Sequence, residues 1–309
     1  MSYMRSFMDD FEVSIPEISS VEIEKIEDNG FDISEYYLDY LNYSVLHNPL
    51  RKFPYFTACN IHGDLFKKIN RDELFSGKGD KWKKDERIPK ETQLGQELYG
   101  ADKSDFDKGH LTKREDVQWA TNRNKAIEAA ESTFYFTNAM PQVDRLNRGV
   151  WRRIEDYILH HQTVENNIKI NVFTGPVFFE DDPDFVTKVK DNIIQIPYVF
   201  WKVVYYKMNG ALHRTGFITS QKHLLEKRRI VKPSVRAEAK PESDLFMTFK
   251  DAETYQVRVE FIEKTSGLSF QKANENFLGE TPEELILSGV DVRSEDSLSI
   301  EKVSINITL

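Results

Sequence analysis

The sequence holds a single cysteine, Cys59, and contains no long uncharged apolar run. One cysteine cannot form a disulfide within the chain, and the absence of a CxxC pair removes the usual sign of a zinc knuckle or redox centre. A membrane helix needs about eighteen consecutive apolar residues, and a secretory signal needs a basic start followed by an apolar stretch. Because neither pattern is present, the sequence predicts a cytoplasmic protein with no membrane partner.

Glycine and proline are also few, at 14 and 11 of 309 residues, which excludes collagen and low-complexity chains. The chain is 39% hydrophobic and 30% charged, a composition typical of a globular protein with a sizeable core. We find no internal repeat. The length allows one large domain or two small ones.

The net charge of -9 is unevenly distributed along the chain. Residues 1–44 hold 2 basic and 11 acidic residues, residues 45–270 hold 37 and 32, and residues 271–309 hold 3 and 8. A local basic excess lies at 67–90, with 9 basic and 5 acidic residues. All the acidity therefore lies in the two flanks, and the mildly basic centre permits a nucleic-acid partner.

Hydrophobic spacing and turn residues give a first set of elements. Strands are expected over 43–46, 53–61, 168–174, 193–197, 200–207 and 212–219, with a short one over 21–24 and an edge strand over 303–309. Helices are expected over 115–131, 147–162 and 241–271, and turns at 48–49, 175–176 and 209–210. The polar stretch 63–105 is expected to be a long surface loop, and such loops are usually functional.

The segment 106–155 carries the residues with the clearest chemistry, beginning with His110. A lone histidine is most often a structural residue. Here Asp107 and Gly109 precede it, and glycine lets the backbone bend closely where the imidazole is aimed. The context therefore favours a functional histidine.

Downstream, Asn147, Trp151 and Glu155 follow one another at i+4 spacing. In one continuous helix they would share a sector about 80° wide, with the amide and the carboxylate projecting the same way. Two plainer interpretations remain open. Asn147 would also serve as a helix N-cap, and Glu155 as a solvated acid paired with Arg152.

These residues resemble the DNA/RNA non-specific endonuclease family, whose active site is the ββα-metal or His-Me finger. Asp-Lys-Gly-His at 107–110 is similar to the family's Asp-Arg-Gly-His motif, and TNAMPQ (137–142) with LNRGVWRRIED (146–156) is similar to its second block. The resemblance covers about 41–271. It implies a nuclease domain at 41–271, and the flanks outside it are an acidic arm at 1–40 and an acidic tail at 272–309. The implied fold class is α+β, with a mostly antiparallel central sheet flanked by helices.

The resemblance also implies the roles of the site residues. His110 is the expected general base, since its unperturbed pKa lies near neutral pH. Asn147 is the expected direct ligand of one Mg²⁺, for which Mn²⁺ can substitute, and Glu155 reaches the ion through its waters. Asn138 is expected to orient the site. Of the loop cations, Arg87 is the first candidate for transition-state stabilisation, and Arg71, Lys81 and Lys84 on the same loop also remain open.

Three further residues are expected to contact substrate: Asp107, Lys108 and Arg148. Lys108 stands where the family has arginine, so it keeps the charge but loses the bidentate fork. The implied activity is metal-dependent hydrolysis of DNA, RNA or both, leaving 5′-phosphate and 3′-hydroxyl ends, in a regulated effector or toxin. The alternative is a catalytically silent nucleic-acid-binding or scaffold protein with the same fold.

The remaining expectations concern partners and the acidic arm. A homodimer, an inhibitor and an activating partner are all compatible with a nuclease that must be restrained in its own cell. Residues 1–44 would either occupy the substrate channel as a phosphate mimic or form a packed extension with no regulatory role. The sequence slightly favours the packed extension.

Overall fold

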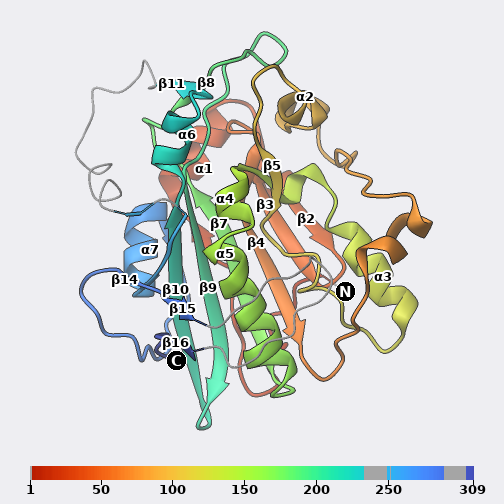
Figure 1. The fold of residues 1–309 in the computed structure, drawn as a ribbon, viewed down its shortest axis with the longest axis vertical. Coiled ribbons are helices and arrows are strands. Elements are labelled where there is room, and N and C mark those ends of the chain that lie inside the picture. The colour runs from red at the N-terminus through yellow and green to blue at the C-terminus, as the bar shows by residue number, and fades with distance from the viewer. Residues whose placement is uncertain (1, 233–248, 251, 289–303) are drawn as a thin grey trace.

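The computed structural model describes residues 2–232, 249–250, 252–288 and 304–309. Its centre is an eight-stranded sheet in the order β14-β12-β10-β9-β7-β4-β3-β2, with antiparallel pairing throughout (Figure 1). The strands are β2 (Tyr37–Tyr40), β3 (Tyr43–Asn48), β4 (Phe53–His62), β7 (Lys169–Val177), β9 (Val199–Met208), β10 (Ala211–Ser220), β12 (Thr254–Val257) and β14 (Glu283–Glu284). Together with the helices on its faces, this confirms the expected α+β class.

The longest hairpin, β9 with β10, shows why the local sequence folds as expected. Its strands are rich in aromatic and β-branched residues, and the register pairs Met208 with Ala211 across the turn. The two turn residues, Asn209 and Gly210, have φ values of 51° and 77°. Asn and Gly tolerate this left-handed region, and such turns match the twist of paired strands.

The two faces of the sheet are covered by different parts of the chain. On one face, here called the arm face, Asn60 and Phe173 meet the N-terminal residues, and Tyr205 lies against Phe173. On the opposite face, here called the site face, Thr174 and Lys202 meet the helix that carries Trp151. Successive residues of a strand point to opposite faces, so the paired neighbours Phe173–Val203 and Thr174–Lys202 define the two sides.

The acidic arm is packed on the arm face. Tyr3 is 8% exposed and its ring lies 5.5 Å from that of Phe173, while the Met4 N–H donates to Asn60 Oδ1 at 2.7 Å. Asp9 pairs with Lys169 and Asp10 with Lys207. The arm's carboxylates therefore meet lysines of the sheet on the side away from the site face.

Shorter elements complete the fold. The helices are α1 (Ser20–Asp28), α2 (Gln96–Tyr99), α3 (Arg123–Ser132), α4 (Asp144–Asn147), α5 (Val150–Asp156), α6 (Lys222–Lys227) and α7 (Val259–Ser266). The 3₁₀ segments are η1 (Ile33–Tyr36), η2 (Arg71–Gly77), η3 (Lys90–Thr92) and η4 (Phe136–Asn138), and η5 (Tyr157–Val164) is a π-helix. Four two-stranded sheets pair β1 (Glu17–Ile18) with β13 (Leu268–Ser269), β5 (Asp107–His110) with β6 (Ala139–Gln142), β8 (Asp184–Phe185) with β11 (Val231–Lys232), and β15 (Leu287–Ser288) with β16 (Ser304–Ile305). Across the described ranges, no helix is both long and apolar enough to span a membrane.

Several sequence expectations were wrong in detail. The strand expected over 21–24 is part of α1, whose N-cap Ser19 accepts a hydrogen bond from the Glu22 N–H. The segment 193–197 holds only an isolated bridge at Gln195, and 175–176 lies inside β7. The helix expected over 115–131 begins at Arg123. Within 241–271, β12 precedes α7, and residues 241–248 lie outside the described part, as does residue 303 of the expected edge strand.

Candidate active site

Two strands and the helices that follow them place the candidate site residues on the site face. In the β5–β6 pair, Asp107 lies opposite Gln142 and His110 opposite Ala139. The chain then runs directly into α4 and α5, which follow one another across the sheet in Figure 1. This is a ββα arrangement, with His110 on the first strand and Asn147 on the first helix.

Gly109 leaves room for the Gln142 side chain of β6. A Cβ at this position would lie 2.0 Å from Gln142 Oε1, so any side chain here would have to displace the Gln142 side chain. The other side of β6 is fixed by Gln221, which is fully buried and donates to the carbonyls of Pro141 and Pro197 at 3.0 Å each. No local pattern pointed to Gln221, because its partners are far away along the chain.

His110 lies among aromatic rings. Its ring centroid is 4.7 Å from that of Trp82 and 5.0 Å from that of Phe134. Part of the residue reaches solvent, yet its Nε2 atom is buried and has no hydrogen-bond partner among the described residues. Desolvation by burial, and then the positive charges of Arg71 and Arg114, lower the pKa of His110 to about 3. The imidazole is therefore neutral near pH 7, and the same burial and positive charges make it a weaker base than a free imidazole.

Among the loop cations, the structure places Arg71 rather than Arg87 in the field of His110. Arg71 holds Asp80 through its Nε at 3.0 Å, and its charge is among those that lower the pKa of His110. Arg87 instead binds Asp85 through Nε and a terminal nitrogen at 2.9 and 2.7 Å, and stacks over Tyr40. Of the two lysines considered with them, Lys84 binds Glu97 and Lys81 lies exposed on the loop surface.

Asp107 organises the start of the helical part. One carboxylate oxygen accepts from Asn147 Nδ2 at 3.0 Å, and both accept from the Arg148 guanidinium at 2.9 and 2.8 Å. Asp107 and Arg148 were both expected to contact substrate. In the structure Asp107 holds Asn147 and Arg148 in place, while the Arg148 side chain remains 62% exposed.

The single helix expected over 147–162 is interrupted, which overturns the shared sector proposed for Asn147 and Glu155. Asn147 is the last residue of α4, and α5 begins at Val150 after Gly149, whose ψ of -139° is not helical. Asn147 is therefore not the N-cap of the following helix. The i+4 relation survives only for Trp151 and Glu155.

Glu155 faces the sheet. Its Oε1 lies 3.3 Å from Lys202 Nζ, and the Lys202 ammonium also lies 5.4 Å from the Trp151 ring centroid. Both charged side chains are buried, at 9% and 2% exposure. Burial raises the pKa of Glu155, and the lysines at 202 and 113 oppose that rise. The interpretation as a solvated helix acid is wrong, and the pairing with Lys202 was not predicted.

Asn138 is fully buried and bonded to backbone on both sides of its amide. Its Oδ1 accepts from the Thr112 N–H at 2.9 Å, and its Nδ2 donates to the carbonyls of Thr112 and Thr133 at 3.0 Å each. These bonds fix the chain just after His110. Asn138 is thus placed to position His110 through the backbone rather than to contact a substrate.

Two groups offer ligand atoms to a cation. The Asn147 Nδ2 donates to Asp107, and no described residue bonds to its Oδ1, so this oxygen suits a hard cation such as Mg²⁺. Separately, ligand atoms of Glu115, Asp156 and His160 lie within 4.8 Å of one another. The Lys113 ammonium already pairs with both of these carboxylates.

Comparison with known proteins identifies the family of this fold and motif set. A family model described as DNA/RNA non-specific endonuclease matches residues 24–277. The chain is 28% identical over 209 residues to human mitochondrial endonuclease G and 26% identical over 182 residues to a nuclease of Serratia marcescens. An uncharacterized protein of Sinorhizobium fredii, y4fB, is 37% identical over 193 residues.

These matches are partial in length. They cover 65%, 58% and 60% of this chain, and 60%, 62% and 27% of the human, Serratia and Sinorhizobium proteins. A solved structure of an EndoG/EndoGI complex superposes with a TM-score of 0.51 at 19% identity, covering 81% of this chain and 91% of the other. That likeness supports the fold.

Proposed function

Because the chain belongs to the DNA/RNA non-specific endonuclease family, we propose that it hydrolyses phosphodiester bonds of DNA, RNA or both with the help of a divalent cation. The proposed products carry 5′-phosphate and 3′-hydroxyl ends. The observation that carries the proposal is His110, a neutral imidazole with an unpartnered Nε2, held on the ββα unit beside a cationic loop. Recognition through phosphates reads the backbone, which gives little sequence preference.

The protein's own residues supply most of what the reaction needs. His110 would take a proton from the attacking water at its Nε2. Arg71 would contribute positive charge near the scissile phosphate, where negative charge develops. Asp107 would keep Asn147 oriented by accepting a hydrogen bond from its Nδ2, which leaves the amide oxygen of Asn147 for the cation. A cation held by Asn147, proposed as Mg²⁺, would neutralise phosphoryl oxygens.

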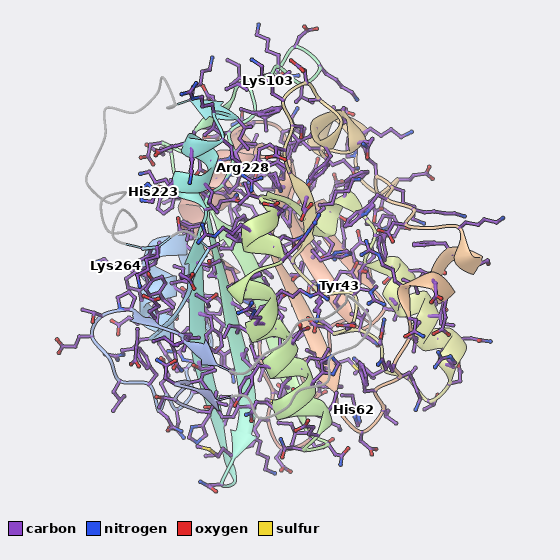
Figure 2. All side chains as sticks on the ribbon, in the orientation of Figure 1. Tyr43, His62, Lys103, His223, Arg228 and Lys264 are labelled. Atoms are coloured by element: carbon purple, nitrogen blue, oxygen red, sulfur yellow. The ribbon has the colours of Figure 1, made fainter. Side chains whose placement is uncertain are left out.

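The first test is His110→Ala in a plasmid and total-RNA digestion assay. Loss of the general base should lower cleavage by ~10²–10⁴-fold, with little change in the circular dichroism spectrum. His223→Ala is the matched control, because His223 is partly exposed on α6 at the left of Figure 2 and pairs with Glu226 of the same helix. Cleavage by His110→Ala at the rate of this control would remove His110 from the mechanism.

A second test concerns the cation. Asn147→Ala should raise the Mg²⁺ concentration needed for half-maximal cleavage or abolish cutting, because the proposed ligand oxygen is gone. Asn147→Asp keeps an oxygen at that position and should retain part of the activity. Full cleavage in EDTA would contradict metal dependence. If neither DNA nor RNA is cut but both are bound, the protein is a catalytically silent nucleic-acid-binding member of the family.

A further inference from the structure

Arg71 is held by a carboxylate of its own loop. Its Nε donates to Asp80 Oδ1 at 3.0 Å, and a terminal nitrogen donates to Oδ2 of the same carboxylate. A guanidinium binds two oxygens of a phosphate group in this same bidentate geometry. Both side chains reach solvent, at 43% and 24% exposure. A phosphate that approaches this edge of Arg71 therefore meets a position that Asp80 already occupies.

Both ends of the loop that carries this ion pair are fixed beside His110. Before the loop, the guanidinium of Arg114, which follows His110 on the chain, donates to the Ile69 carbonyl at 2.9 Å. After the loop, the Trp82 ring lies 4.7 Å from the His110 ring. Burial and nearby arginines lower the pKa of His110, and the negative charge of Asp80 opposes that lowering. Asp80 therefore places a negative charge in the region where the scissile phosphate is proposed to bind.

The two halves of this loop are held differently. In the first half, Glu131 Oε1 accepts a hydrogen bond from the Phe75 N–H. In the second half, Gly77 and Gly79 have φ values of 73° and 75°, in the left-handed region that glycine adopts without strain. A Cβ on Gly79 would meet no atom within 4 Å beyond its chain neighbours, so the backbone next to Asp80 has open space around it. Movement of the second half alone would carry the Asp80 carboxylate off the guanidinium.

We propose that Asp80 is an internal substitute for a substrate phosphate: its carboxylate occupies the bidentate edge of Arg71 in the free protein and is displaced by the backbone of a nucleic acid. Arg71 stays paired throughout, because one bidentate anion replaces another. The contact lowers the affinity for nucleic acid of any sequence, since phosphates carry no base information. This inference rests on the proposed function in taking a nucleic acid as the substrate.

The test measures binding without cleavage. Fluorescence anisotropy of a short labelled single-stranded DNA and of its duplex is followed over a salt series, in EDTA, with His110→Ala as the parent protein. Asp80→Asn should tighten binding by about two- to fivefold at low salt, the factor expected from the loss of a competing, partly exposed ion pair. Asp72→Asn is the matched control, because it removes the same charge from the same loop and Asp72 has no ion pair with a described residue. Its affinity should change less.

A double-mutant cycle shows whether Asp80 acts through Arg71. In the parent with Arg71→Gln, Asp80→Asn should change the affinity no more than Asp72→Asn does, because no guanidinium remains to be released. In the enzyme with His110 intact, Asp80→Asn should lower KM and leave kcat unchanged, since the carboxylate has already left Arg71 once substrate is bound.

The proposal is overturned if Asp80→Asn binds like the control, if its gain in affinity persists without Arg71, or if it weakens binding, which would make Asp80 a support that holds Arg71 in place. An enzyme that cuts nucleic acid with any of these results keeps its proposed function and loses only this inference. A protein that shows the Arg71-dependent gain but cuts neither DNA nor RNA keeps this inference and loses the proposed activity. A parent that binds neither probe at low salt removes both.

Discussion

At the scale of single residues, burial is the main cause of the protonation state of two histidines. His47 is 0% exposed, its Nε2 lies 2.8 Å from the Thr92 carbonyl oxygen, and burial lowers its pKa to about 4. The pKa of His110 is lowered as well, by burial first and then by the positive charges of Arg71 and Arg114. In both residues, the folded protein favours the neutral ring. At His47 the neutral ring serves the structure, and at His110 an unprotonated ring is needed for base catalysis.

The lowered pKa of His47 predicts a pH dependence of stability. Between about pH 4 and pH 6.5 the unfolded chain binds a proton on His47 that the folded protein does not, so the free energy of unfolding falls as the pH falls. His47→Gln should remove a slope of about 1.4 kcal/mol per pH unit in that window. Urea unfolding of both proteins at several pH values measures it, and parallel curves would show that His47 is not the titrating group.

At the scale of elements, the break between α4 and α5 decides where Asn147 lies. A Cβ at Gly149 would sit 2.1 Å from the Arg145 carbonyl oxygen, a backbone atom of α4. Only glycine therefore allows the second helix to start this close to the first. The break divides the expected helix into two. Asn147 at the end of α4 contacts Asp107, and Glu155 on α5 pairs with Lys202.

Gly149→Ala should disturb this junction. Overpacking costs about 1–3 kcal/mol, and we expect a larger loss in cleavage because Asn147 is two residues away. Gly267→Ala is the control: Gly267 caps α7 with φ 71°, where alanine costs about 1–2 kcal/mol far from Asn147. Chemical unfolding and cleavage per folded molecule separate the two effects, and equal cleavage in both variants would make the junction irrelevant to the site.

The sequence predicted elements well where local signals suffice. The strands at 200–207 and 212–219 were placed within a few residues, since aromatic and β-branched runs flank an Asn-Gly turn. The helix break was missed because the apolar spacing continues across Gly149. The pairing of Glu155 with Lys202, and the choice of Arg71 over Arg87, depend on contacts between distant segments, which no local pattern contains.

At the scale of the whole molecule, the sheet separates residues 2–15 of the acidic arm from the candidate site. The arm lies against Asn60 and Phe173 on one face, and Glu155 meets Lys202 on the other. Asp9 and Asp10 are engaged by Lys169 and Lys207. A segment held this way cannot reach the ββα unit as a phosphate mimic without detaching, so the structure supports the packed extension.

The position of the arm predicts what its removal does. Deleting residues 1–15 removes several buried side chains, among them Tyr3, Phe7 and Val13. Each buried side chain of this kind contributes about 1.5–3 kcal/mol, so the truncated protein should unfold at much lower denaturant concentration. Asp9→Asn with Asp10→Asn removes only charge and should change stability little, since exposed ion pairs contribute about 0–1 kcal/mol.

Neither change should strengthen nucleic-acid binding, because residues 2–15 lie on the arm face. Anisotropy in the His110→Ala parent over a salt series tests this, since masking by a nearby acidic segment is greatest at low salt, where surface charges are least screened. Tighter binding by the truncated protein at low salt, with stability unchanged, would mean that the arm leaves the sheet and masks the site. Loss of stability with unchanged binding would establish the arm as an outer layer of the fold, whose acids balance the lysines at the ends of β7 and β9.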